Sequence, residues 1–375
     1  MLPDLAPRHP RSARPLRVLM TADAVGGVWT YALDLARGLA GQGARVTLAV
    51  LGPPPRPAQQ AQAMAVPGLE LVQTGLELDW TAPGPEAVRT AAAGIRDLAG
   101  GADLVHLNSP ALAGFEGFDA PVVAACHSCV ATWWAAVRGG PLPSDFQWRR
   151  DLAALGLLAA DRLVAPSAAF AAATAEAYGL RRPPRTVHNG RAPAALGAPS
   201  GEVFVFTAGR LWDEGKNLAT LDRAAARLPV PVLAAGPLEG PNGARVALPH
   251  LHTPGELDGP GMAAHLAAAP VFASAARYEP FGLATLEAAQ AGCPLVLSDI
   301  PSFREIWGEA AEFVSPDDDA GFARAIRDLL ADPLLRRRRG QAARARAARY
   351  SVQAMVEGTL RLYRELLPAS REVLA

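Results

Sequence analysis

The sequence predicts an α/β protein with two doubly wound parallel sheets that face each other across a cleft. Three observations support this fold class. Short apolar runs alternate with helical patterns along the chain, which is typical of βαβ units. The alternation restarts after residues 190–201, a stretch rich in Pro, Gly and Ala. Finally, 375 residues are more than one hydrophobic core usually serves.

Five apolar runs in the first half of the chain are expected to be strands that are buried on both faces. They comprise residues 18–20, 46–51, 104–107, 122–125 and 163–165. Helical patterns lie among them at residues 30–39, 87–98 and 151–159. This alternation predicts a mostly parallel sheet with helices on both sides.

The second half of the chain repeats the same arrangement. Its expected strands are residues 203–208, 230–235, 271–273, 295–297 and 313–314. Its clearest helices are residues 218–228, 283–291 and 320–330, followed by an Arg-rich helix and a final helix at 352–367. In the helix at 320–330, Phe322, Ile326 and Leu329 fall on one face, as in a helix that packs on a sheet.

Charge and cysteine content exclude several classes of protein. Lys plus Arg and Asp plus Glu both number 36, so a strongly basic nucleic-acid binder is not expected. Three cysteines, Cys126, Cys129 and Cys293, are too few for a disulfide framework and indicate a reducing compartment. The N-terminus has no apolar core of signal-peptide length, and no uncharged apolar run reaches about 18 residues. We therefore expect a cytoplasmic protein; contact with a membrane surface and the oligomeric state stay open.

Ligands of open α/β sheets bind beyond the carboxyl ends of the strands, so the residues that follow the strands are the first candidates. Gly26 and Gly27 follow the first strand, and a diglycine lets the backbone approach an anion or a sugar closely. The spacing is not G-x-G-x-x-G, which gives a nicotinamide or flavin cofactor little support. A plain structural turn is the alternative interpretation.

Two cations follow the first strand of the second half. Arg210 offers a planar fork to phosphate oxygens, and Lys216 offers a compact point charge. A diphosphate that leaves a sugar needs such neutralisation as its bond breaks. The alternative is an exposed loop with ordinary surface charges.

Glu279 and Glu287 flank a predicted strand-to-helix turn marked by Pro280 and Gly282. The amides of Phe281, Gly282 and Leu283 would point at a phosphate, one carboxylate would accept from sugar hydroxyls and the other from ribose hydroxyls. In the alternative interpretation Glu279 caps the helix and Glu287 is a solvated helix residue.

Two further motifs invite a metal or redox interpretation. Cys126-His127-Ser128-Cys129 ends a predicted strand, but a tetrahedral zinc site wants four ligands, and Cys293 is remote. His127 is the better candidate as a residue in the cleft, with a buried structural histidine as the alternative. The D-x-D within residues 317–319 precedes an amphipathic helix, so capping is favoured over metal binding.

Together these segments resemble glycosyltransferase family 4, the retaining glycosyl transferases group 1 with the GT-B fold. The resemblance extends from Gly26 to the C-terminal helix, and its most specific part is the E-x7-E pattern from Glu279 to Glu287. The segment Gly209-Arg210-Leu211 with Lys216-Asn217 comes next. Ala291-Gly292-Cys293-Pro294, which follows the E-x7-E pattern, belongs to the most specific part of the resemblance. Weaker support comes from residues 165–167, 188–190 and 236–237.

The resemblance implies a division of the chain into five segments. They are a flexible basic arm at 1–15, an acceptor-side Rossmann-like domain at 16–191, a linker at 192–201, a donor-side Rossmann-like domain at 202–350 and, at 351–375, a C-terminal helix that packs back across the cleft onto the N-terminal domain.

The resemblance also implies a role for each matching residue. Arg210 and Lys216 would hold the donor diphosphate, Glu279 the donor sugar and Glu287 the ribose. The remaining contacts would come from the amides of Phe281, Gly282 and Leu283, from Gly26 and Gly27 in the other domain, and from His127 near the reacting carbon. Enzymes of this group look metal-independent, so neither a metal nor another cofactor is expected.

Three positions depart from the family pattern. Arg191 stands where an aliphatic residue and then Asp usually follow His-Asn-Gly. Ser274-Ala275 replaces the common Pro-Ser, and the segment 126–134 is distinctive and lies where an acceptor would be handled. These departures affect the identity of the acceptor more than the binding of the donor.

The predicted activity is the transfer of a hexose, with retention, from a UDP- or GDP-sugar to a hydroxyl acceptor in polysaccharide, glycolipid or glycoside biosynthesis. A glycoside hydrolase that uses Glu279 and Glu287 as acid and nucleophile is one alternative. A nucleotide-sugar epimerase of similar fold and a non-catalytic sugar-binding protein are the others. The expected partners are the donor and the acceptor.

Overall fold

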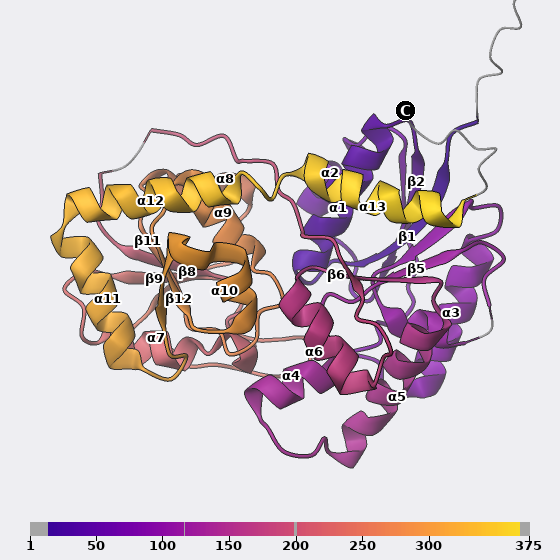
Figure 1. Ribbon diagram of the computed structural model, residues 1–375, viewed down its shortest axis with the longest axis horizontal. Coiled ribbons are helices and arrows are strands. Elements are labelled where there is room, and N and C mark those ends of the chain that lie inside the picture. The colour runs from indigo at the N-terminus through magenta and orange to yellow at the C-terminus, as the bar shows by residue number, and fades with distance from the viewer. Residues whose placement is uncertain (1–13, 116, 199–200, 368–375) are drawn as a thin grey trace, which may run out of the picture.

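The computed structural model describes residues 14–115, 117–198 and 201–367. Figure 1 shows two halves side by side, each with a sheet between layers of helices. Every pairing between named strands in these residues is parallel. The predicted fold class is therefore confirmed. Most of the predicted basic arm, residues 1–13, lies outside the described residues.

The N-terminal half has a sheet with the strand order β3-β2-β1-β4-β5-β6-β7. Its strands are β1 (Arg17–Asp23), β2 (Arg45–Leu51), β3 (Leu69–Gln73), β4 (Leu104–Leu107), β5 (Val122–Ala125), β6 (Arg162–Ala165) and β7 (Arg185–Thr186). Its helices are α1 (Gly27–Gly41), α2 (Pro57–Met64), α3 (Pro85–Leu98), α4 (Val130–Val137), α5 (Ser144–Ala159) and α6 (Ala168–Tyr178). The strand order reverses between β1 and β4, where the following loops diverge and leave room for a ligand.

The C-terminal half has a sheet with the strand order β10-β9-β8-β11-β12-β13. Its strands are β8 (Val205–Ala208), β9 (Val232–Ala235), β10 (His252–Gly255), β11 (Val271–Ser274), β12 (Leu295–Ser298) and β13 (Ala311–Val314). Its helices are α7 (Leu218–Ala225), α8 (Gly259–Ala267), α9 (Leu283–Ala291), α10 (Pro301–Trp307), α11 (Asp319–Ala331) and α12 (Pro333–Ala347). Here the order reverses between β8 and β11.

The sequence did not predict strands β3, β7 and β10, and each of them lies at the edge of its sheet. They were missed because edge strands lack the continuous apolar run on which the prediction relied. Their residues are exposed or only half-buried. Helices α2, α4, α6, α8 and α10 were not predicted either. Of these, α6 is rich in Ala on every face and therefore shows no apolar stripe.

The last helix, α13 (Val352–Leu366), returns to the N-terminal half and packs on α1. It is the yellow helix that crosses the upper right of Figure 1. A Cβ at Gly38 in α1 would lie 2.2 Å from Cγ2 of Val356, so only glycine allows this close packing. The buried ring of His106 joins the two helices, since its Nδ1 lies 2.7 Å from Oη of Tyr363 and its Nε2 3.3 Å from Oη of Tyr31.

Within the residues that the structure describes, no helix combines the length and the apolar character that a membrane span needs.

Candidate active site between the two halves

Most of the predicted site residues follow central strands of the two sheets. Gly26 and Gly27 follow β1, Arg210 and Lys216 follow β8, and Glu279 follows β11. These are the strands at which the strand order of each sheet reverses. The fold therefore places these residues at the positions where ligands of doubly wound sheets bind.

Lys216 and Glu279 form an ion pair between Nζ and Oε2. Only 20% of the lysine side chain and 16% of the glutamate side chain are exposed. The hydroxyl of Ser302 donates to the backbone carbonyl of Glu279 at 2.5 Å and fixes the turn that carries it. Lys216 is also the only lysine in the sequence; every other basic side chain apart from histidine is Arg.

Backbone contacts hold the loop of Lys216 against the turn of Glu279. The amides of Arg277 and Tyr278 donate to the carbonyl of Gly215 at 2.9 and 3.2 Å. Asn217 adopts the left-handed conformation with φ 52°, and its side-chain amide donates to the carbonyl of Ala275 at 3.0 Å. The ion pair is thus built on two segments that are already joined.

Asp213 orients the second predicted cation, Arg210. One carboxylate oxygen accepts from Nη2 of Arg210 at 2.9 Å, and the other accepts from the amide of Gly215 at 2.9 Å and from Nε1 of Trp133 at 3.1 Å. Burial alone would raise the pKa of Asp213, but the charges of Arg210 and Lys216, together with the hydrogen bonds from Trp133 and Gly215, outweigh it and keep that pKa below its usual value. Asp213 is therefore ionised at neutral pH and holds Arg210 in place.

The diglycine of the N-terminal half lies against the C-terminal half. A Cβ at Gly26 would lie 3.7 Å from Nη1 of Arg210, and a Cβ at Gly27 would lie 3.3 Å from Cδ1 of Leu283. Gly26 is also the N-cap of α1, without a side-chain capping bond. The first turn of α1 therefore lies near Arg210.

Helix α9 begins at Leu283, where the sequence predicted its start. Its N-cap is Gly282, in the left-handed conformation with φ 92°, and no side chain caps it. The alternative in which Glu279 caps this helix is therefore wrong, because the carboxylate of Glu279 pairs with Lys216 instead. The first amides of α9 have no acceptor within the helix and are free for an anion.

Glu287 is a paired carboxylate rather than a solvated helix residue, and only 22% of its side chain is exposed. Nε of Arg191 donates to Oε1 of Glu287 at 2.7 Å. Nη1 of the same arginine donates to Oδ2 of Asp34 in α1 at 2.8 Å. Arg191 thus links a carboxylate of each half of the molecule.

Both neighbours of Glu279 in the chain contact the N-terminal half. Oη of Tyr278 accepts from the amide of Cys129 at 3.2 Å and lies 2.9 Å from Oγ1 of Thr132. The carbonyl of Pro280 accepts from Oγ of Ser167 at 2.7 Å. The turn that carries Glu279 is therefore held by residues of both halves.

His127 follows β5 in the N-terminal half, and its Nε2 lies 2.9 Å from Oδ1 of Asn108. The amide nitrogen of Asn108 donates to the carbonyl of Thr21 at 2.6 Å, so its oxygen faces His127 and the hydrogen of His127 is assigned to Nε2. Burial lowers the pKa of His127 to about 4. At neutral pH the ring is uncharged, and Nδ1 is available to accept a hydrogen bond.

The two motifs that invited a metal interpretation have other contacts in the structure. Cys126 and Cys129 are free thiols, and Sγ of Cys129 lies 2.9 Å from Oγ1 of Thr132. Asp318 caps α11 by accepting from the amide of Gly321 at 2.7 Å, which confirms the capping interpretation. In the described part of the chain, no group of three or more His, Cys, Asp or Glu side chains could hold a metal ion.

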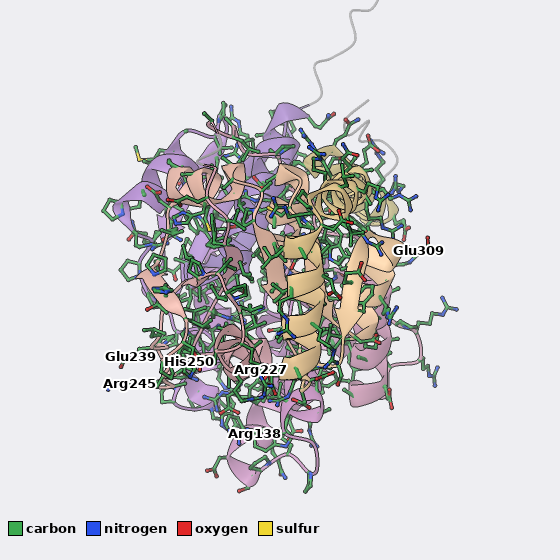
Figure 2. The ribbon with its side chains drawn as sticks, turned by 90° about the vertical axis from the view of Figure 1, so that its left-hand side faces the viewer. Arg138, Arg227, Glu239, Arg245, His250 and Glu309 are labelled. Carbon is green, nitrogen blue, oxygen red and sulfur yellow. The ribbon has the colours of Figure 1, made fainter. Side chains whose placement is uncertain are left out.

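Two exposed ion pairs also join the halves. Arg138, labelled in the lower part of Figure 2, pairs with Glu214 at 2.5 Å, and Arg56 pairs with Glu256. Pairs this exposed contribute only about 0–1 kcal/mol each. They help to align the halves, whereas the buried contacts around Glu279 fix them.

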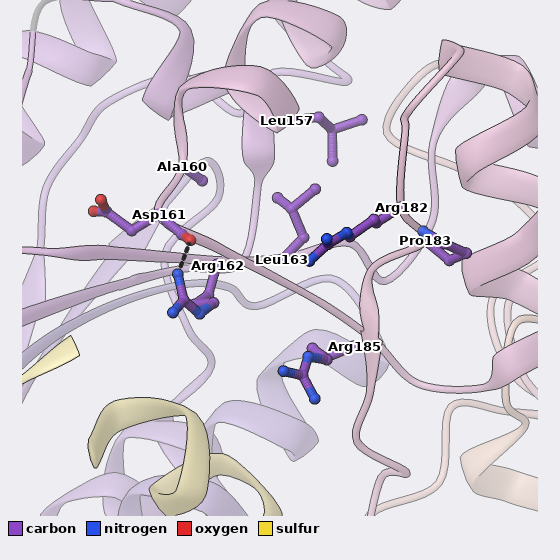
Figure 3. Close-up of a pocket in the computed structure, with 8 residues that line it drawn as sticks. All are labelled: Leu157, Ala160, Asp161, Arg162, Leu163, Arg182, Pro183 and Arg185. Atoms are coloured by element: carbon purple, nitrogen blue, oxygen red, sulfur yellow. Dashed lines mark hydrogen bonds between the residues drawn. The ribbon is translucent and has the colours of Figure 1, made fainter. Parts of the chain in front are cut away.

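A pocket of about 390 Å³ lies away from this site, at the outer edge of the N-terminal sheet. Figure 3 shows the side chains that line it, among them Arg162, Arg182 and Arg185. Glu365 pairs with Arg162 at 3.0 Å and with Arg185 at 3.7 Å. None of the predicted site residues lines this pocket, so we do not assign the predicted chemistry to it.

The structure brings together Gly26, Gly27, Arg210, Lys216, Glu279 and the start of α9, whereas His127 is held by a separate set of contacts in the N-terminal half. Sequence reasoning missed three residues that hold this site: Asp213, Trp133 and Asp34. Asp213 could have been found from its place between the two cations in the same loop. Trp133 lies in the distinctive segment 126–134, but nothing in the sequence connects it to Asp213. Asp34 carries no signal, because its partner Arg191 is remote in the chain.

Two protein-family models match the chain. The model described as Glycosyltransferase Family 4 matches residues 25–194, and the model described as Glycosyl transferases group 1 matches residues 190–346. Together they cover residues 25–346, which include every predicted site residue.

Individual proteins and solved structures are also similar to this chain. Glycogen synthase from Mycobacterium tuberculosis is 40% identical over 112 residues, which make up 29% of this chain and only 27% of that protein. The solved structure of sucrose-phosphate synthase from Thermosynechococcus elongatus has a TM-score of 0.73 at 21% identity and covers 94% of this chain and 99% of its own. The structure of Anabaena HepE in complex with UDP-glucose has a TM-score of 0.72 at 19% identity and covers 94% and 100%. Both structures share the fold of this chain.

Proposed function

Because this chain belongs to glycosyltransferase family 4, we propose that it transfers a hexose from a nucleoside-diphosphate sugar to a hydroxyl acceptor with retention of anomeric configuration. The observation that carries the proposal is the arrangement of Arg210, Lys216 and Glu279 at the open N-terminus of α9. It provides positive charge and free amides for a diphosphate beside a carboxylate for a sugar.

The leaving group accounts for the positive part of the site. When the bond between the anomeric carbon and the phosphate oxygen breaks, negative charge grows on the diphosphate. Arg210, Lys216 and the first amides of α9 stabilise that charge in place, without reorganisation. Gly26 allows the backbone of α1 to approach the same group from the other half.

The carboxylates account for the recognition of the donor. Glu279 accepts from hydroxyls of the transferred sugar, and its pairing with Lys216 keeps it next to the diphosphate. Glu287 lies about one helical turn along α9 and accepts from the ribose. A glycoside hydrolase would need one of these carboxyls protonated as an acid. Each is instead paired with a cation, Lys216 or Arg191.

The acceptor reacts on the same face of the sugar that the diphosphate leaves. The acceptor oxygen forms its bond to the anomeric carbon, and its proton passes to the departing diphosphate oxygen. No side chain needs to act as a strong acid in this step, which agrees with an uncharged His127. His127 would accept a hydrogen bond from a hydroxyl of the donor sugar through Nδ1.

The proposal includes independence from metal ions, because the protein's own cations and amides neutralise the diphosphate. Incubation with UDP-, GDP- and ADP-hexoses and a panel of hydroxyl acceptors, with and without EDTA, tests this. Proton NMR of the product reads its anomeric configuration. An α-linked product from an α-linked donor, formed equally well in EDTA, is expected.

Four results would contradict the proposal. An inverted product would exclude the retaining mechanism. Cleavage of oligosaccharides without a nucleotide sugar would point to the glycosidase, and conversion of the donor to its epimer without an acceptor would point to the epimerase. Nucleotide-sugar binding without any turnover would identify a sugar-binding protein.

A further inference from the structure

Arg191 is fastened to the C-terminal half through its backbone. Its amide donates to the carbonyl of Tyr350 at 3.1 Å, and its carbonyl accepts from Nε2 of Gln290 in α9 at 2.8 Å. Gln290 lies about one helical turn beyond Glu287 in α9, so these contacts place the side chain of Arg191 beside Glu287. The resemblance to family 4 gives this position to an aliphatic residue, so the guanidinium is a property of this chain.

The guanidinium lies between two carboxylates from different halves. It donates from Nε to Glu287 and from Nη1 to Asp34, at 2.7 and 2.8 Å. The exposed fractions of the three side chains are 30% for Arg191, 22% for Glu287 and 3% for Asp34. Charges shielded from water to this degree interact more strongly than a surface pair, and removing the shared cation leaves both carboxylates without this partner.

The contact with Glu287 engages only Oε1. The second oxygen, Oε2, is left to accept from a ligand. A carboxylate has free rotation about its terminal bond in solution, and the bond to Arg191 removes that freedom at a helix position where the backbone is rigid. The planar fork of Arg fixes the direction of the carboxylate as well as its charge.

The contact with Asp34 connects the same carboxylate to α1. Asp34 lies in the helix whose N-terminus is the diglycine, two turns away from Gly27. Arg191 therefore joins the helix that faces the diphosphate from one half to the residue that faces the ribose from the other.

We propose that Arg191 is a positioning residue that orients Glu287 toward the ribose hydroxyls of the donor and makes this orientation depend on α1 of the other half. The inference rests on the proposed donor site. It assigns selectivity for a ribonucleotide to a residue that touches no part of the nucleotide.

The test measures ribose selectivity rather than activity alone. UDP, GDP and ADP are titrated into the wild type by calorimetry, and the nucleotide that binds is compared with its 2′,3′-dideoxy analogue. Hydrogen bonds to a charged acceptor are worth about tenfold or more in affinity, so the wild type should prefer the ribose form by about that factor. In R191A this preference should fall to within about threefold.

Arg37 provides a matched control. It also donates to Asp34, from Nη1 at 2.8 Å, but its side chain is half exposed and it has no contact with Glu287. R37A should keep the ribose preference of the wild type. E287A should lose it, and R191A combined with E287A should lose no more than E287A alone, because the two residues act as one unit.

The outcomes separate this inference from the proposed function. If the wild type binds none of the nucleotides, the donor site is wrong and this inference falls with it. If the wild type prefers the ribose form and R191A keeps that preference, only the role of Arg191 is overturned, even when R191A melts at a lower temperature. R191Q, which keeps a donor without the charge, is measured in the same way if R191A does not fold.

Discussion

Lys216 and Glu279 form an ion pair although 63 positions separate them in the chain. The pair joins the loop after β8 to the turn before α9, and both side chains are mostly buried. Removing either partner therefore leaves a charge with little solvent around it. In the proposed enzyme the same two groups contact the diphosphate and the sugar, so the pair connects donor binding to the local stability of the site.

Replacement of Lys216 by Ala should lower the rate of sugar transfer by about 10²–10³-fold, the usual cost of removing one preorganised charge-stabilising donor. K216R is the matched control for charge. It should recover part of the rate because it keeps the positive charge, but not all of it, because a guanidinium is bulkier than an ammonium. Initial rates with the best nucleotide sugar provide the measurement. A K216A enzyme within tenfold of the wild type would contradict the assignment.

Replacement of Arg210 by Ala should have a comparable effect on transfer, about 10²-fold, because it removes a cation that Asp213 holds beside the diglycine. The control is R245A. Arg245 pairs with Glu239 at 2.8 Å in the loop after β9, and Figure 2 labels both residues at the molecular surface. This pair is exposed, so R245A should change the rate less than about twofold. Equal effects of the two substitutions would rule out a special role for Arg210.

Stability should fall as the pH falls below about 6.5, the pKa of a free histidine. Burial lowers the pKa of His106 to about 3 and that of His127 to about 4. Below pH 6.5 these histidines bind protons in the unfolded chain but stay unprotonated in the folded chain. Each histidine therefore lowers the free energy of unfolding by up to about 1.4 kcal/mol per pH unit, down to its folded-state pKa. Above pH 6.5 neither contributes to the dependence.

Urea unfolding of H127N between pH 7 and pH 4 checks this prediction. The variant should lose part of the wild-type slope, because one of the two histidines with a lowered pKa is gone. H250N is the control, since His250 is exposed and labelled at the surface in Figure 2. A wild-type stability that stays constant over this range would contradict the expected sign.

Gly236 should not tolerate a side chain. Its φ is 143°, and a Cβ there would lie 1.8 Å from the carbonyl oxygen of Gly209, in the loop that leads to Arg210. G236A should therefore destabilise the fold by about 3 kcal/mol or more. Gly243 also has a positive φ, 78°, but its Cβ would meet no atom within 4 Å. G243A should cost only about 1 kcal/mol, and equal melting temperatures of the two variants would count against the backbone contact.

The central strands and the ends of several helices could be predicted from the sequence, because burial on both faces leaves continuous apolar runs. Residues 104–107, 122–125 and 283–291 match the structure in full. The edge strand β3 was missed because its alternation is weak and its residues are only partly buried. Local patterns carry little information where tertiary contacts decide the structure.

The residues of the candidate site could likewise be predicted only where local sequence patterns mark them. Glu279 and Lys216 were found because each sits beside turn residues at the end of a strand. Their direct pairing was not predicted, since it depends on how the loops after β8 and β11 meet. The partner of Arg191 was hidden for the same reason: Glu287 lies 96 positions away, and nothing in the spacing points to it.

The central claim is that Lys216 binds the diphosphate of a nucleotide sugar. The sequence allows a direct measurement of this contact. Because Lys216 is the only lysine, an acylating reagent has one side-chain amine to modify, and peptide mass spectrometry separates it from the N-terminal amine. The extent of modification is followed without ligand and with saturating UDP-, GDP- and ADP-glucose. We expect at least one nucleotide sugar to protect Lys216 while the N-terminal amine reacts as before. Equal modification of Lys216 under all conditions, with a nucleotide sugar demonstrably bound, would contradict the claim.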